Sequence, residues 1–435
     1  MKGDLQMGAI LNVRVVLILV VFAVFIGLMI AKKLPTILAL PILGVIVAVI
    51  AGVPFLKAPE ADGQTIMGFV IGQGASRLAG TIIATIFGGM FAKVIQKQGI
   101  SDAIIRKAAE LAGDKPYAIA FVLTAATALI FSAIGGAGPV IMVSTIVIPL
   151  MLSAGIPDIA AASLVLLGIS TGGLFNVSNY QFYVDTIGMD MEIVKSGSLI
   201  IGILSAVAII LYIMLNVNRK NTRSSWAMPA KKAEKEVGIP ALLAPIVPIL
   251  LVFLFKFSAE LSLLTAIIYT ILVTKPKQII QIASGSFVEG IQDVSGVIAL
   301  MIGIGILLNG VSAKETTALM QPLIQAVMPS SPLVYVVLFT LLSPLALYRG
   351  PLNMYGLGSG LANIMMAAGT LSPAAIGMAL RATGVVQGVS DPTNTQNVIV
   401  ADFAKVDVNA ILKSTLPYTV LITLGTLIYT ACFVF

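Results

Sequence analysis

The sequence has no histidine, one cysteine and few charged residues. Without histidine, the chain cannot build a His-dependent zinc site or a Ser-His-Asp triad. Its single cysteine, Cys432, cannot form an internal disulfide. It also has no glycine-rich phosphate-binding loop, no cysteine cluster and no aspartate-rich diphosphate motif. We therefore predict that the protein is not an enzyme and has no cofactor, and that any uphill transport draws on an ion gradient.

The composition is too apolar for a soluble protein of this length. Of the 435 residues, 58% are hydrophobic and 10% are charged, which leaves too little polar surface to cover a soluble body. Apolar runs such as 15–30, 201–215 and 411–435 are long enough to cross a hydrocarbon core of roughly 30 Å. The sequence therefore predicts a multi-pass protein of the cell inner (plasma) membrane, surrounded by the lipid bilayer.

The net charge of +7 indicates membrane sidedness rather than nucleic-acid binding. A basic segment at 218–237 joins the two halves of the chain, and a short basic loop is expected to face the cytoplasm. Placing this linker inside also puts most of the 26 basic residues inside. The charge distribution therefore predicts that both termini lie outside.

A polar motif occurs twice, 215 positions apart. Residues 176–181 (NVSNYQ) recur as 391–396 (DPTNTQ), and each copy interrupts a long apolar segment. A second break lies upstream of each copy, at 136–139 and at 348–351. Unwound chain at membrane depth is tolerated only where protein or a water-filled cavity covers its free backbone groups. Two polar breaks in each half therefore indicate a binding site.

The repeat predicts an all-α polytopic membrane protein made of two inverted repeats of five transmembrane helices each, a design common in transporters. Each repeat would hold a re-entrant hairpin and a broken helix. If the hairpins cross the membrane fully, the chain has fourteen spans instead of ten, and the charges do not distinguish these alternatives. The expected segments are a first repeat at 1–217 with hairpin 116–154 and broken span 157–192, the linker at 218–237, and a second repeat at 238–435 with hairpin 331–368 and broken span 372–400.

The two broken spans offer oxygen ligands at close spacing, which suits a hard cation such as Na⁺. Asp391 could alternatively carry a coupling proton. The alternative is that each break is a polar kink that packs two helices together. Three other acids, Asp185, Glu289 and Asp293, are interpreted as interfacial charges. The candidate sodium ligands are Ser132, Asn176, Ser178, Asp391 and Thr393.

The hairpin tips and the arginines of the second half are the candidate substrate-binding groups. Glycines let the backbone approach a ligand closely, and a proline after each tip can begin a half-helix that attracts an anion. Arginine in a membrane segment normally faces a partner or a cavity. Alternatives are a small-residue packing patch at the first tip and a structural ion pair of Arg381 with Asp391 or Asp402. The candidate substrate-binding residues are Gly136, Gly138, Asn179, Arg349, Arg381 and Asn394.

The paired tips at 135–139 and 349–351, followed by the breaks at 176–181 and 391–396, resemble the substrate and cation sites of the ion transporter superfamily. The segment 87–116 is most similar to the gluconate permease and citrate symporter branches, and the superfamily also includes the divalent anion:sodium symporters. The resemblance implies a homodimer in which a transport domain moves like an elevator along a scaffold domain. The tips depart from the Ser-Asn-Thr of the divalent-anion symporters.

These observations predict a secondary active transporter that imports a small organic anion, such as a di- or tricarboxylate or a sugar acid. Transport would be coupled to sodium or protons. A cation/proton antiporter of the same superfamily is the first alternative. A membrane enzyme that acts on a lipid-linked substrate is a remote one.

Overall fold

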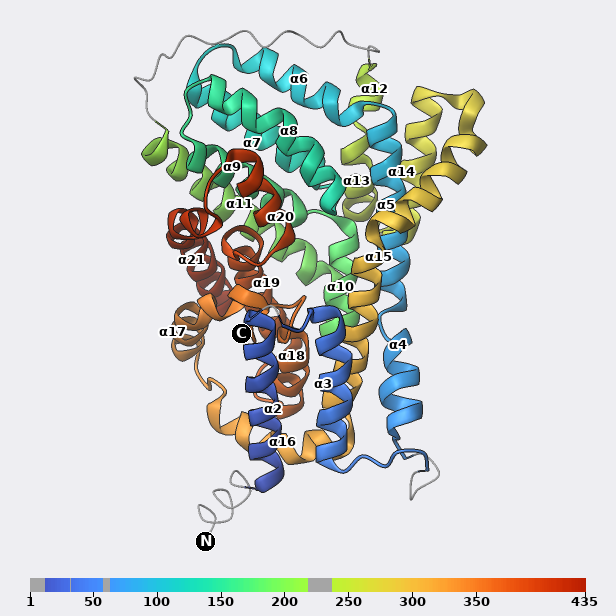
Figure 1. Ribbon diagram of the computed structural model, residues 1–435, viewed down its shortest axis with the longest axis vertical. Helices are drawn as coiled ribbons and strands as arrows, with labels where there is room; N and C mark the ends of the chain where they lie inside the picture. The colour runs from blue at the N-terminus through green and yellow to red at the C-terminus, as the bar shows by residue number, and fades with distance from the viewer. Residues whose placement is uncertain (1–11, 32, 58–62, 218–236) are drawn as a thin grey trace.

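The computed structural model describes residues 12–31, 33–57, 63–217 and 237–435, and in this part of the chain the secondary structure is helical throughout (Figure 1). The predicted linker lies outside the described residues except for Val237. The first half contains α2 (Val13–Ile30), α3 (Thr36–Ala51), the π-helix η1 (Ile66–Gln73), α4 (Gly74–Ser76), α5 (Ala79–Lys97), α6 (Ile100–Ala112), α7 (Pro116–Phe131), α8 (Ala137–Ser153), α9 (Asp158–Gly173), α10 (Val177–Ile187) and α11 (Met191–Asn216).

The second half has a similar succession of elements. It contains α12 (Ile239–Leu242), η2 (Ala244–Ile246), α13 (Val247–Leu254), α14 (Ala259–Thr274), η3 (Pro276–Gln278), α15 (Ile279–Ser312), α16 (Lys314–Val327), α17 (Pro332–Leu342), η4 (Ser343–Arg349), α18 (Gly358–Ala368), α19 (Pro373–Ser390), α20 (Thr395–Ala404) and α21 (Val408–Phe433).

Length and composition agree with a membrane protein. Among the described residues, six helices are long and apolar enough to cross a membrane, or seven if the pair α9 and α10, bent by 63°, counts as one broken span. Five shorter apolar helices accompany them, including α7, α8 and α14. The chain is therefore an all-α, multi-pass membrane protein with a broken span, and this part of the prediction from the sequence is confirmed.

The predicted breaks occur where polar residues end or start a helix. Asn176 caps α10, because its side-chain oxygen accepts from the N–H of Ser178 at 3.1 Å. At the second break α19 ends at Ser390, and the Asp391 carboxylate accepts from the N–H of Thr393 at 2.9 Å. Both side chains satisfy backbone donors that the helix interruption leaves free.

The long helices α5 and α15 lie side by side (Figure 1). They approach closely at Gly89 and Gly290, where an added methyl group on Gly290 would lie 2.5 Å from the backbone nitrogen of Met90. Small residues allow such close contact between membrane helices. The amphipathic helices α6 and α16 lie at opposite ends of the molecule (Figure 1).

Candidate functional site

A cavity of about 640 Å³ lies between the two halves. Its wall combines both hairpin tips, both broken spans and the faces of α5 and α15. The first tip contributes 133–137 and the first broken span contributes residues from 169 to 183. The second tip contributes Arg349, Met354 and Tyr355, and the second broken span contributes residues from 381 to 396. Segments that are far apart in the sequence therefore surround one space.

Most of the candidate substrate-binding residues line this cavity. Those that do are Gly136, Asn179, Arg349, Arg381 and Asn394, and the candidate sodium ligands Asn176 and Ser178 join them. Gly138, Ser132, Asp391 and Thr393 are not part of the wall. Ser132 ends α7 and donates to the carbonyl of Leu129 at 2.7 Å.

Arg381 is a buried cation with unused donors. Its side chain is 3% exposed. Its Nη2 donates to the carbonyl of Leu174 at 3.0 Å and to the hydroxyl of Ser198, whereas its Nε and Nη1 have no hydrogen-bond partner in the described part of the chain. The guanidinium carbon lies 5.4 Å and 5.0 Å from the ring centres of Tyr180 and Tyr183, at a distance suited to cation–π attraction. The protein therefore holds this arginine firmly without neutralising it.

The contacts of Arg381 do not support the alternative that this residue forms a structural ion pair. No ion pair links Arg381 to Asp391 or Asp402 among the described residues. Asp402 instead pairs with Lys405 at 3.1 Å on an exposed surface. The arginine is left with charge and donors that an anion in the cavity can use.

Arg349, at the tip of the second hairpin, is a second cation that lines the cavity. Tyr348 and Arg349 have φ angles of +57° and +60°, so two successive non-glycine residues adopt the left-handed region. Such a backbone is costly and is typical of functional sites. Arg349 forms no hydrogen bond or ion pair with another described residue. Asp391 is close enough for the two charges to interact.

At the first break, side-chain amides connect segments of both halves. Asn179 donates to the carbonyl of Gly173 at 2.9 Å and accepts from the hydroxyl of Tyr355 at 3.0 Å. Asn176 points its amide at the carbonyls of Phe131 and Ile134, at 3.5 Å and 3.4 Å. The first break, the first tip and the second hairpin are thus joined through polar contacts.

At the second break, Asp391 and Asn397 carry buried oxygen atoms that no described residue uses. Asp391 is fully buried, its Oδ1 accepts from the Thr393 hydroxyl at 2.7 Å, and its Oδ2 has no partner among the residues that the structure describes. The side-chain oxygen of Asn397, whose amide donates to the carbonyl of Asp391 at 2.9 Å, is also buried without a partner. A buried carboxylate is costly unless it is neutralised. Hard cations prefer such oxygen ligands.

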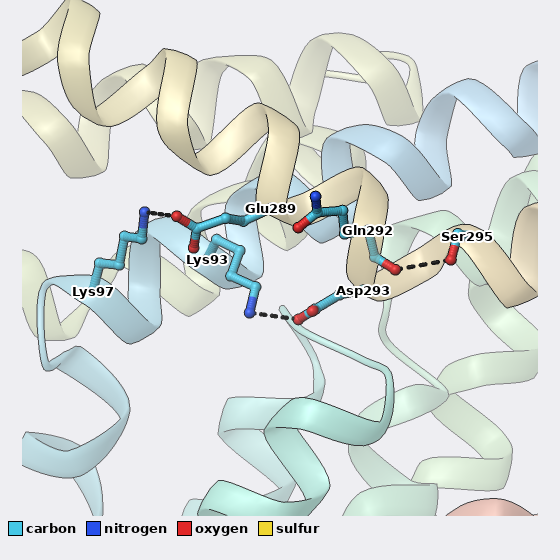
Figure 2. Close-up of polar contacts among 6 residues, drawn as sticks. All are labelled: Lys93, Lys97, Glu289, Gln292, Asp293 and Ser295. Atoms are coloured by element: carbon cyan, nitrogen blue, oxygen red, sulfur yellow. Dashed lines mark hydrogen bonds and ion pairs between the residues drawn. The ribbon is translucent and has the colours of Figure 1, made fainter.

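Sequence reasoning missed several residues of the site. Asp293, interpreted as an interfacial charge, lines the cavity and forms an ion pair with Lys93 at 2.7 Å (Figure 2). Tyr355 and Asn397 were also missed. Asn397 directly follows the motif and lies three residues after Asn394, the N-cap of α20, so the periodicity of this helix could have indicated it. Nothing in the sequence shows that Asp293 faces the hairpin tip.

Comparison with known proteins shows a transporter fold. No protein-family model and no curated protein matches the sequence. Among solved structures, the YdaH transporter of Alcanivorax borkumensis matches with a TM-score of 0.60 and 14% identity over 92% of this chain and 97% of that one. MtrF of Neisseria gonorrhoeae, described as illuminating a class of antimetabolite efflux pumps, matches with a TM-score of 0.53 and 12% identity over 91% and 94%.

These matches correct the resemblance drawn from the sequence. The structural similarity is to YdaH and MtrF, so the assignment to the gluconate permease, citrate symporter and divalent anion:sodium symporter group is wrong. That assignment relied on the segment 87–116 and on the tip and break motifs. The motifs are short and are determined by the needs of a helix interruption. The similar structures are transporters and not enzymes. The dimer and the elevator movement lose the support that the resemblance gave them.

Proposed function

We propose that the protein is a secondary active transporter of a small organic anion, such as a di- or tricarboxylate or a sugar acid. The observation that carries this proposal is the pair of cations at the cavity: Arg349 has no polar partner among the described residues, and Arg381 keeps its Nε and Nη1 free. An arginine with unused donors at membrane depth is costly. A carboxylate that binds its planar fork would offset this cost.

Coupling to sodium or protons would act at Asp391. The carboxylate is fully buried and one of its oxygens has no partner, so binding of Na⁺ or H⁺ removes an unfavourable charge. Asn397 and the carbonyls released at the break can complete a cation site there, and Thr393 holds the carboxylate in place. Asn176 and Ser178 offer a related set of oxygens at the first break.

The order of the helices supports two inverted repeats. In each half a hairpin follows an amphipathic helix and precedes an interrupted helix, and α6 and α16 lie at opposite ends of the molecule (Figure 1). We propose on this basis that the hairpins and broken spans form a transport domain and that α5 and α15 belong to a scaffold domain. The basic linker would lie in the cytoplasm and both termini outside.

Outward transport is the second candidate. It is favoured by the structural similarity to MtrF, which is described as an efflux pump. The same cavity serves either direction, because the coupling ion and its gradient determine which way an anion moves. A cation/proton antiporter is the alternative in which no organic anion is carried.

The test is transport by purified protein in proteoliposomes. A panel of radiolabelled carboxylates and sugar acids is presented outside, or loaded inside, under inward and outward gradients of sodium or protons. We expect gradient-dependent accumulation or release of at least one anion, and loss of this activity in Arg381→Met. Sodium-driven pH change without any organic anion would select the antiporter. No movement of any anion under any gradient would refute the proposal.

A further inference from the structure

Two ion pairs connect α5 to α15, one helical turn apart. Lys93 pairs with Asp293 at 2.7 Å and Lys97 pairs with Glu289 at 2.5 Å (Figure 2). The outer pair is partly exposed, with 39% and 43% of its side-chain surfaces accessible, whereas the corresponding fractions of Lys93 and Asp293 are 18% and 30%. Only the inner pair reaches the cavity, because Asp293 is part of its wall. The two pairs therefore have similar chemistry and different surroundings.

Asp293 also lies close to the tip of the first hairpin. A methyl group added to Gly138 would lie 3.2 Å from Oδ2 of Asp293, the same oxygen that pairs with Lys93. Gly138 lies in the first turn of α8, and Gly136, the residue that precedes this helix, provides no side-chain cap. The first N–H groups of a helix lack intrahelical partners and carry a partial positive charge. The carboxylate thus lies beside the N-terminal end of α8, where the helix carries its partial positive charge.

Asn176 holds the start of the tip by donating to the carbonyl of Ile134 at 3.4 Å, but the two glycines that follow have no close neighbour among the described residues. Added methyl groups on Gly135 and on Gly136 would meet nothing within 4 Å, so the glycines face open space. Gly136 has a φ of +99°, which restricts this turn to glycine. One carboxylate on α15 is therefore well placed to determine the position of the tip.

We propose that Asp293, oriented by Lys93, is a positioning residue that holds the first hairpin tip, residues 135–138, against α15 at the edge of the cavity. Release of this contact lets the tip move away from α15. Its relevance to transport rests on the proposed function, whereas the contact itself does not. The neighbouring pair of Lys97 and Glu289 joins the same helices without touching the tip and has no such role.

Thiol labelling at the tip tests the proposal. The natural cysteine is removed by Cys432→Ser, and Gly135→Cys introduces a probe where the backbone has no positive φ and space is open. The rate of maleimide labelling is then compared in Asp293→Asn, Lys93→Gln and the matched control Lys97→Gln. We expect the labelling rate to rise about fivefold to tenfold in Asp293→Asn, because this change removes a partly buried charge contact and an interaction with the end of a helix. The rise should be smaller in Lys93→Gln and absent in Lys97→Gln.

A double-mutant cycle adds a second readout. Gly138→Leu should accelerate labelling in the natural background by pushing the tip away from Asp293, and should add little in Asp293→Asn, where the contact is already lost. Asp293→Glu retains the carboxylate and should restore slow labelling in part. Equal labelling rates in Asp293→Asn and the parent protein would overturn the proposal, and so would an equal rise in Lys97→Gln.

Failure of the proposed contact between Asp293 and the tip and failure of the proposed function give different results. Labelling needs no substrate, so altered labelling without anion transport would support the tip contact and count against the transport proposal. Anion transport with unchanged labelling would support the transport proposal and count against the tip contact. If Asp293→Asn does not fold, as judged by its thermal unfolding, the comparison of Lys93→Gln with Lys97→Gln decides the matter alone.

Discussion

Replacing Arg381 by methionine should separate ligand binding from stability. Arg381→Met keeps much of the side-chain length and removes the charge together with the free Nε and Nη1 donors. Loss of one partner of a buried, hydrogen-bonded charge pair costs about 2–5 kcal/mol, which weakens binding roughly 30-fold to several-thousand-fold. The anion affinity should therefore fall by at least one order of magnitude.

The ligand-free protein should respond differently to the same change. Removal of an uncompensated buried cation is favourable, because keeping an ion in a low-dielectric environment costs several kcal/mol. The carbonyl of Leu174 and the hydroxyl of Ser198 lose a donor, which costs about 1–3 kcal/mol for each group left unsatisfied. These effects oppose each other, so we expect little net change in thermal stability.

A thermal-shift assay measures both the stability of the ligand-free protein and its affinity for the anion. In the natural protein, a ligand at 100 times its Kd raises the free energy of unfolding by about 2.7 kcal/mol, and Arg381→Met should reduce this increase to about 1 kcal/mol or less at the same ligand concentration. Tyr183→Phe is the control that keeps the ring over the guanidinium. Tyr183→Leu removes it and should weaken binding by about 1 kcal/mol. The reasoning is refuted if Arg381→Met retains the full ligand-induced shift.

Three other substitutions test separate parts of the site. Asp391→Asn should abolish accumulation driven by a sodium or proton gradient while leaving downhill exchange of the anion, and unchanged gradient-driven uptake would contradict the coupling role. Arg349→Gln should raise the KM for the anion about tenfold through loss of one charge contact, and an unchanged KM would remove Arg349 from the site. Gly290→Leu should lower the Tm, because overpacking against α5 costs about 1–3 kcal/mol, whereas Gly296→Ala, which meets open space, should leave it unchanged.

The local features of this site could be read from the sequence because each is determined by a few adjacent residues. A helix interruption needs side chains that satisfy free backbone groups, so Asn176 and Asp391 indicate the breaks directly. A sharp tip needs glycine, and Gly136 with its positive φ is a clear example. Arginine in an apolar segment signals a cavity by its cost alone, which is how Arg381 was found.

Tertiary partners could not be predicted, because they depend on how distant helices meet. Tyr180 and Tyr183 look like ordinary apolar positions of a helix until Arg381 is placed between their rings. Asp293 looks like an interfacial acid until α15 is placed beside the first tip. Family assignment failed for the same reason, since short motifs describe how a helix is interrupted and not which chain folds around it.

The positions of three charges explain how anion and cation binding can be linked. Arg381 lies on α19, Asp391 lies directly after its end, and Arg349 is close enough to Asp391 for their charges to interact. Neutralising Asp391 with Na⁺ or H⁺ removes the competing negative charge near Arg349 and makes that arginine more attractive to a carboxylate. Thermodynamic linkage is reciprocal, so the factor by which the cation tightens anion binding must equal the factor by which the anion tightens cation binding. Measured binding constants that violate this symmetry, or that show no linkage, would exclude Asp391 as the coupling group.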